Sequence, residues 1–227
     1  MAIITKGILG GFSGKLGPAV GFRWKKQDVI RANSEKSDKP PTIKQIANRA
    51  KFKLARFFAG QLEHLLRFGL QSRSHKLMPS ERFVQHFMLY AITGSYPDFK
   101  IDYGQVMLSK GILNTGTVKR EMVLQDGLLT VSWGEPNELN ADDVAKLVLY
   151  EESSRQFYYG NLQTERSALK VSWPISNAFN GDKLVGWLFF VAADGLSASR
   201  TVYLGEIDLL QAVLTPGNTE KNETARD

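Results

Sequence analysis

The spacing of apolar residues along the chain changes character near residue 100. From Ile43 to Phe68 the apolar residues recur at steps of three and four, which places them on one face of a helix. Thr42 precedes this run, and Gln45 follows Thr42 by three residues. This spacing is typical of a capping box at a helix start. With Gly69 as the residue that ends it, the pattern predicts one helix over residues 43–68.

A second, shorter helix is predicted after Ser80, because Phe83, Phe87 and Tyr90 continue the helical spacing. After Asp98 the apolar residues alternate with a period of two, which is typical of strands. Segments with this pattern are residues 105–113, 128–133, 145–150, 156–159, 167–173, 184–193 and 199–207. Seven short strands at this spacing predict a β-sandwich.

The first 42 residues follow neither period. Six glycines lie among apolar residues between positions 7 and 21, and each costs about 1 kcal/mol in a helix. We therefore expect turns and short strands, with residues 21–24 and 28–32 forming a hairpin around Lys25, Lys26 and Gln27. Residues 33–41 are polar and end in two prolines, which predicts a linker or extended arm.

Composition supports a folded chain, since 43% of the 227 residues are apolar and 11% are aromatic. The predicted fold class is α+β, with an N-terminal glycine-rich hairpin and helices followed by a seven-stranded sandwich. The predicted domains are residues 1–100, a basic region of hairpin and helices, and residues 101–210, the sandwich. Residues 211–227 are expected to form a flexible tail.

Two segments of the C-terminal half resemble immunoglobulin-like and fibronectin type III sandwiches. Leu129-Thr130-Val131-Ser132-Trp133 is similar to the second strand of this class with its core tryptophan. Residues 187–197, with the sequence WLFFVAADGLS, are similar to the penultimate strand and its turn. The resemblance implies an immunoglobulin-like sandwich, although the stretch after Trp133 is longer than in this class and leaves the strand order open.

The whole chain also resembles an uncharacterised family of Bacteroidetes proteins of the DUF6266 type. The residues that carry this are GGFSGKLG at 10–17, Gly21 with Trp24, VIR at 29–31 and P-T-x-x-Q-x-x-x-R-x-x-F at 41–52. Similar short patterns occur in some phage-like proteins. The resemblance implies a family and no established activity.

Charge is distributed unevenly under a net charge of +6. Residues 1–120 hold 21 Lys and Arg against 7 Asp and Glu, whereas residues 121–227 hold 8 against 16. Opposite charges on the two halves favour head-to-tail self-association, in which the basic arm of one copy docks on the acidic half of another.

We therefore predict a non-catalytic protein–protein interaction or assembly module that docks through its basic N-terminal arm. The residues predicted to bind a partner are Arg23, Trp24, Lys25, Lys26, Arg31, Arg49, Lys53, Arg155 and Tyr158. Two alternatives stay open. The same cations could neutralise phosphates of a nucleic acid while Trp24 stacks on a base, or the arm could bind a membrane surface.

The sequence does not favour catalysis or a cofactor. The chain has no cysteine, which excludes thiolate chemistry and Cys-ligated zinc. Lys15 is followed by Leu16 where a phosphate-binding loop needs Ser or Thr. The histidines are eleven residues apart rather than at metal-binding spacing, at His64, His75 and His86. We predict no enzyme activity, no cofactor, no metal site and no small-molecule substrate.

Other chemical features have structural explanations. The adjacent acids Asp142 with Asp143 and Glu151 with Glu152 are expected to be solvated or to point to opposite faces of a strand. The tryptophans on predicted strands are expected in the core, at Trp133, Trp173 and Trp187. No apolar run reaches the roughly 20 residues of a transmembrane helix, and residues 1–24 lack a secretory signal pattern, so we expect a cytoplasmic location.

Overall fold

The computed structural model describes residues 3–4, 11–34, 38–71, 77–119, 122–125, 127–135, 141–160, 164–175 and 183–209. The chain divides into two compact units, Met1–Thr42 and Ile43–Asp227. The domain boundary predicted near residue 100 lies inside the second unit, because the helices and the large sheet of that unit share one core. The predicted tail, residues 211–227, lies outside the described residues.

The first unit is a four-stranded antiparallel sheet in the order β1-β2-β3-β4. Its strands are β1 (Ile3–Ile4), β2 (Phe12–Leu16), β3 (Ala19–Trp24) and β4 (Gln27–Ala32). Lys25 and Lys26 form the two-residue turn between β3 and β4 and have φ angles of 45° and 68°. Two successive residues with positive φ are typical of a type I′ turn, which matches the twist of a hairpin. The hairpin predicted around these lysines is present.

The second unit begins with three helices and a π-helical turn. They are α1 (Ile43–Gln61), α2 (Glu63–Gly69), α3 (Pro79–His86) and the turn Phe87–Ala91. The single helix predicted over residues 43–68 is interrupted at Leu62, which is fully buried between α1 and α2. Phe58, Phe83 and Phe87 are buried on the inner side of this helix layer.

Gly69 ends α2 by close packing, rather than as the left-handed residue that the sequence pattern predicted. A Cβ atom on Gly69 would lie 2.2 Å from the backbone oxygen of Leu108. The carbonyl of Gly69 accepts hydrogen bonds from the Ser109 hydroxyl and the Lys110 amide, each at 3.0 Å. The helix end is therefore held against the segment that follows residue 105.

Two antiparallel sheets and a separate hairpin complete the second unit. The large sheet has the order β10-β9-β13-β14, with β11 also paired to β9. Its strands are β9 (Val144–Glu151), β10 (Gln156–Tyr158), β11 (Thr164–Glu165), β13 (Lys183–Val191) and β14 (Val202–Asp208). The small sheet has the order β12-β8-β7, with β7 (Val123–Gln125), β8 (Leu128–Ser132) and β12 (Lys170–Pro174). The hairpin is β5 (Ile92–Ser95) with β6 (Asp98–Ile101).

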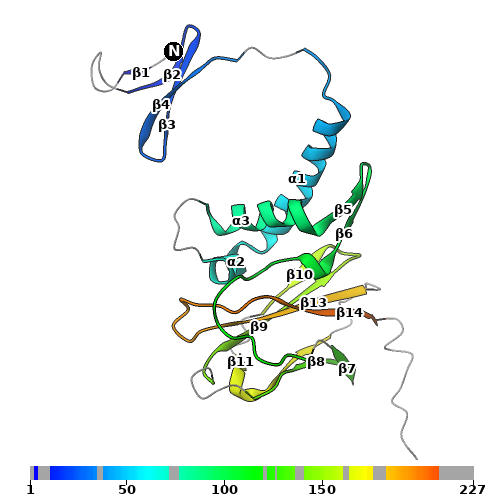
Figure 1. Ribbon diagram of the computed structural model, residues 1–227. Coiled ribbons are helices and arrows are strands. Elements are labelled where there is room, and N and C mark those ends of the chain that lie inside the picture. The colour runs from blue at the N-terminus through cyan, green and yellow to red at the C-terminus, as the bar shows by residue number, and fades with distance from the viewer. Residues whose placement is uncertain are drawn as a thin grey trace, which may run out of the picture. The chain divides into compact units, whose positions relative to one another are not determined.

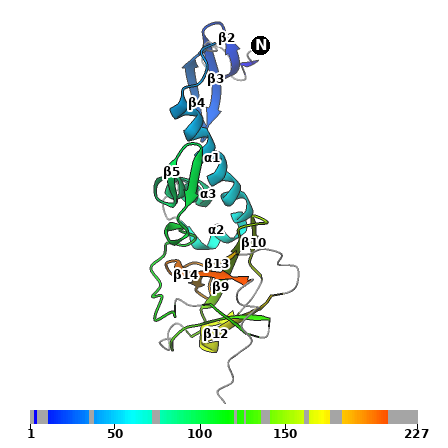
Figure 2. The ribbon, with the colours of Figure 1, turned by 90° about the vertical axis from the view of Figure 1, so that its right-hand side faces the viewer.

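The helices cover one face of the large sheet, and the small sheet lies against its other face (Figures 1 and 2). Side chains alternate between these two layers along β13. Trp187 and Phe189 belong to the core under the helices, whereas Leu188 and Phe190 belong to the core between the sheets. The central strands of the large sheet are therefore buried on both faces.

The fold is mixed α+β, as predicted, but the sequence pattern did not give all of its strands. Residues 105–113 form no strand: a 3₁₀ turn (Tyr103–Gln105) leads into an irregular segment. The amides of Leu108 and Ser109 both donate to the Thr201 hydroxyl, at 3.0 and 2.7 Å, instead of to a strand. Conversely, β7, β11 and the β5–β6 hairpin were not predicted. In the described part of the chain, no helix has the length and apolar character needed to cross a membrane.

The close packing at Gly69 gives a direct test of the contact between α2 and the irregular segment at Leu108. The Gly69→Ala variant should lose about 1–3 kcal/mol of unfolding free energy, because its methyl group collides with backbone rather than with a movable side chain. Gly60 lies in the same helix layer with open space around it, so Gly60→Ala should gain about 0.5–1 kcal/mol. Chemical denaturation of both variants measures the difference, and equal effects would contradict the packing described here.

Candidate partner-binding surfaces

The predicted partner-binding residues fall into two groups. The first unit contains Arg23, Trp24, Lys25, Lys26 and Arg31. The second unit contains Arg49 and Lys53 on α1, Arg155 before β10 and Tyr158 on β10. The two groups therefore belong to separate compact units of the chain.

The strand register assigns the side chains of residues 11–34, here called the arm, to the two faces of its sheet. Directly opposite residues of antiparallel strands point to the same face, and successive residues point to opposite faces. Lys15 pairs with Val20, and Val20 pairs with Arg31. The aromatic face is therefore formed by Lys15, Val20, Phe22, Trp24, Gln27, Val29 and Arg31. The apolar face is formed by Leu16, Ala19, Gly21, Ile30 and Ala32, with Arg23 and Asp28 near the turn.

Both faces of the arm are accessible. Gly21 is the buried residue among residues 11–34. A Cβ atom on Gly21 would lie 2.6 Å from the ring of Phe12, so this one ring covers the centre of the apolar face. Trp24 is 55% exposed, Leu16 56% and Ile30 66%. The arm thus exposes apolar side chains on both sides of a thin sheet.

Cations lie over the rings of the aromatic face. The Lys25 ammonium is 4.9 Å from the centre of the Trp24 ring, and the Arg31 guanidinium carbon is 5.8 Å from the centre of the Phe22 ring. Cation–π contacts of this kind contribute about 0.5–1 kcal/mol at exposed sites. The arrangement holds positive charge next to flat apolar surface, so this face presents both to a ligand.

In the second unit, Lys53 and Arg155 line the same groove although they are distant in the sequence. The groove has a volume of about 860 Å³ and lies between α1, the β5–β6 hairpin and the ends of β9, β13 and β14. Its apolar lining consists of Ala50, Leu54, Phe57, Phe58, Phe99 and Ile101. Two predicted residues are therefore brought together by the fold, on a surface that combines apolar floor and charge.

Positive charge exceeds negative charge in this groove, with Lys53, Lys100, Arg155 and Lys183 against Glu152 and Glu206. The Lys183 ammonium pairs with Glu206 at 2.5 Å. The Tyr103 hydroxyl donates to Glu152 at 3.2 Å. These contacts occupy both carboxylates and leave an excess of positive charge at the rim.

Burial raises the pKa of Tyr103, and the neighbouring Glu152 charge raises it further. Burial also raises the pKa of Tyr150, to about 12. Both phenols therefore stay protonated at neutral pH, and the Tyr103 hydroxyl is a hydrogen-bond donor in the groove. The groove combines an apolar floor with an excess of positive charge, which suits an anionic ligand with apolar parts.

The aromatic residues beside Arg155 are used mainly inside the fold. Phe157 packs 4.6 Å from the ring centre of Tyr150, and the Tyr159 hydroxyl donates to the Gln61 carbonyl at 2.6 Å. Tyr158 points the other way, and its hydroxyl donates to Glu151 at 3.0 Å. Phe157 and Tyr159 therefore join α1 to the large sheet, whereas Arg49 is exposed on α1.

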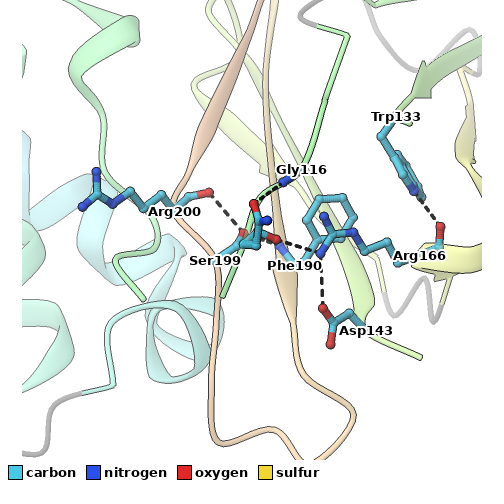
Figure 3. A network of polar contacts seen from close by, with 8 residues as sticks. Gly116, Trp133, Asp143, Arg166, Phe190, Ser199 and Arg200 are labelled. Carbon is cyan, nitrogen blue, oxygen red and sulfur yellow. Dashed lines mark hydrogen bonds and ion pairs between the residues drawn. The ribbon is translucent and has the colours of Figure 1, made fainter. Parts of the chain in front are cut away.

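A buried polar network lies at the edge of the two sheets (Figure 3). The Arg166 guanidinium contacts the Asp143 carboxylate at 3.3 Å, and their side chains are 3% and 7% exposed. The guanidinium also lies 4.3 Å from the centre of the Phe190 ring and donates to the Asn114 carbonyl at 2.8 Å. The Trp133 indole donates to the Arg166 carbonyl at 2.7 Å.

Each adjacent pair of acids has one exposed and one buried member, so the acids are not all solvated: Asp142 and Glu152 are exposed, whereas Asp143 and Glu151 are buried. Burial raises the pKa of Asp143, while the hydrogen bond and charge of Arg166 oppose that shift. Glu151 is also buried and accepts hydrogen bonds from Ser154 and Tyr158. Trp133 and Trp187 are buried in the core as predicted, whereas Trp173 is only partly buried and packs against the edge of the core. We interpret the Arg166 network as structural, because it joins the loop at Asn114 to both sheets.

Metal ligation has little support within the described ranges, where no group of three or more His, Asp or Glu side chains could hold an ion. His64 and His86 lie on helices, and His75 lies outside the described residues. The other groove residues, such as Tyr103, Glu152 and Lys183, were not predicted from the sequence. They come from separate elements and share no local pattern, so only the tertiary fold identifies them.

Comparison with known proteins places the chain in a family. Residues 11–205 match the model of a family of unknown function, DUF6266. The chain belongs to this family. The match includes the arm, the Arg166 network and all residues of the groove except Glu206 in this DUF6266 protein. Searches of curated proteins and of solved structures found no match.

The buried ion pair is testable by removing one charge. Asp143→Asn should cost about 3–5 kcal/mol of unfolding free energy, because the Arg166 charge then stays buried without its counter-ion. The matched control is Glu63→Gln, which removes the same charge from an exposed pair with Arg67 and should cost less than about 1 kcal/mol. Urea denaturation measures both values. A similar small effect in the two variants would show that Arg166 does not need Asp143.

Proposed function

We propose that this protein is a non-catalytic interaction and assembly module that docks through its basic arm. The observation that supports this most is the exposure of both faces of the arm sheet. A small sheet gains stability when an apolar face packs on another layer. Within residues 11–34 the ring of Phe12 is the main cover, so a binding partner would supply the missing layer.

The partner that we propose is the acidic half of a second copy of this chain. Residues 1–42 contain eight Lys and Arg against three Asp and Glu. Residues 121–227 contain 8 Lys and Arg against 16 Asp and Glu. The apolar face would supply buried area through Leu16 and Ile30, and the opposite charges would favour contact between unlike halves over contact between like halves. Such a head-to-tail contact is heterologous and builds rings or open chains.

The arrangement of strands supports an immunoglobulin-like assignment of the sandwich. We infer that β7, β8, β9, β10, β12, β13 and β14 correspond to strands A, B, C, C′, E, F and G of that class. The two sheets then have the orders A-B-E and C′-C-F-G, which that class uses without its strand D. This class binds partners in many proteins, and the step from fold to function is analogy.

A cytoplasmic location and a Bacteroidetes origin stay predictions from the sequence.

Light scattering after size exclusion tests the assembly. The full chain should have a mass that is a multiple of 25.4 kDa at low salt and should dissociate at high salt. The double variant Leu16→Thr with Ile30→Thr, and the triple variant Lys25→Glu, Lys26→Glu and Arg31→Glu, should both shift toward the monomer.

The control for this experiment is a double variant of apolar residues outside the arm that are more exposed than Leu16 and Ile30, Ile112→Thr with Leu196→Thr. It should assemble as the unmodified chain does. A strict monomer of 25.4 kDa at every salt concentration would overturn self-association. Assembly that is lost equally in the control would place the contact elsewhere.

A further inference from the structure

We propose that the aromatic face of the arm is a binding site for single-stranded nucleic acid. The proposed assembly buries the opposite, apolar face, while both proposals use the positive charge of Lys25, Lys26 and Arg31. Phe22 and Trp24 lie two residues apart on β3 and point to the same side of the sheet. Nucleic-acid-binding sheets use such rings as platforms for unpaired bases, and stacking tolerates any base because each has a flat face.

The neighbouring side chains fit the backbone of the same ligand. Lys15 and Arg31 share the aromatic face, and Lys25 and Lys26 occupy the turn at its end. Lys25 and Arg31 lie over the Trp24 and Phe22 rings, so a base that stacks on these rings would take their place, and these cations would then contact its phosphates. The acidic residue of the hairpin, Asp28, pairs opposite Arg23 and therefore lies on the other face. The aromatic face as defined here thus contains no carboxylate.

The aromatic face is better matched to a single strand of nucleic acid than to a duplex, an acidic peptide or a membrane surface. Bases in a duplex are stacked on each other, so they cannot cover Phe22 and Trp24. An acidic peptide offers charge but no regular series of flat rings. A membrane surface needs a broad apolar surface to insert, and on this arm the residues with that character, Leu16 and Ile30, lie on the opposite face.

Half-buried neighbours fix the position of the two rings. Val20 and Val29 lie on the same face and are partly buried, as is Phe22, whereas Trp24 is 55% exposed. The arm therefore presents a supported platform with one accessible indole. Trp133 and Trp187 are buried and Trp173 is partly buried, which makes the exposed Trp24 the tryptophan best placed to report ligand binding by fluorescence quenching.

The test is binding of a fluorescently labelled oligothymidylate to the full chain, followed by anisotropy. Trp24→Ala should weaken binding about 5-fold or more, the effect expected from losing one base–ring stack. Trp24→Phe keeps a ring and should stay within about 3-fold of the unmodified protein, while the ligand-induced quenching of tryptophan fluorescence largely disappears. Circular dichroism of both variants verifies that the fold is kept.

Salt dependence separates phosphate contacts from stacking. For the double variant Lys15→Gln with Arg31→Gln, the slope of log K against log salt should fall by about 1.4, because each phosphate contact with a single strand contributes about 0.7. The control is the apolar-face variant Leu16→Thr with Ile30→Thr, which should bind the oligonucleotide as the unmodified protein does. That variant also separates this site from assembly, since it is expected to affect only the mass in solution.

Several results would overturn the site. They are absence of oligothymidylate binding at low salt, equal affinity of Trp24→Ala and the unmodified protein, and tighter binding to duplex than to single strand. Binding to anionic lipid vesicles that survives Trp24→Ala but is lost in the apolar-face variant would assign the arm to a membrane surface instead. Loss of binding in Trp24→Phe as well as in Trp24→Ala would show that a stacking ring is not what the ligand requires.

Discussion

The burial of β13 on both faces is the constraint on which the rest of the second unit depends. Its residues from Leu184 to Val191 are buried without interruption. One set of alternate side chains needs the helices as cover, and the other set needs the small sheet. A strand of this kind cannot be exposed on either side without a large loss of apolar burial, at about 25 cal/mol per Å². The three layers are therefore a consequence of one apolar strand and its neighbour β9.

The helices pack on the large sheet mainly through aromatic side chains. The Phe58 ring lies 5.1 Å from that of Tyr150 and 5.2 Å from that of Phe157, measured between ring centres. Trp187 lies under the same cluster and donates its indole hydrogen to the Tyr103 carbonyl at 3.0 Å. Earlier in α1 the residues before Ala55 are not buried, so this half of the helix extends past the core. The groove forms there, with one wall from the helix and the other from the β5–β6 hairpin.

Elements that are determined by residues close together in the sequence could be predicted from local patterns. The turn at Lys25 and Lys26, the helix start at Ile43 and the strands around Trp133 and Trp187 each depend on neighbouring residues. The apolar run at residues 184–191 also contained a stronger signal than alternation: an uninterrupted run indicates a strand covered on both faces. That signal indicates a second layer on the sandwich, and it argues against a boundary between helices and strands near residue 100.

Distant contacts could not be predicted in this way. Arg166 and Asp143 are separated by 22 intervening residues, and nothing in either neighbourhood marks them as a buried pair. Residues 105–113 have strand-like spacing, yet their amides bind the Thr201 side chain. The sequence pattern predicts Lys53 from the basic charge along its helix and Arg155 from the aromatic residues beside it, and the fold places both in one groove with an excess of cations.

The sheet of the arm contrasts with β13, which is covered on both faces. Each of its faces lacks the continuous cover that stabilises the large sheet, and the two faces differ in chemistry. Leu16 and Ile30 gain free energy only by leaving water, which favours a protein surface as partner. Trp24 and its neighbouring cations gain more from a ligand with both rings and negative charge, because stacking and phosphate contact then act together. A sheet with two such different open faces has the chemistry to bind two ligands at once, and binding on either face would add part of the stability that its small core does not supply.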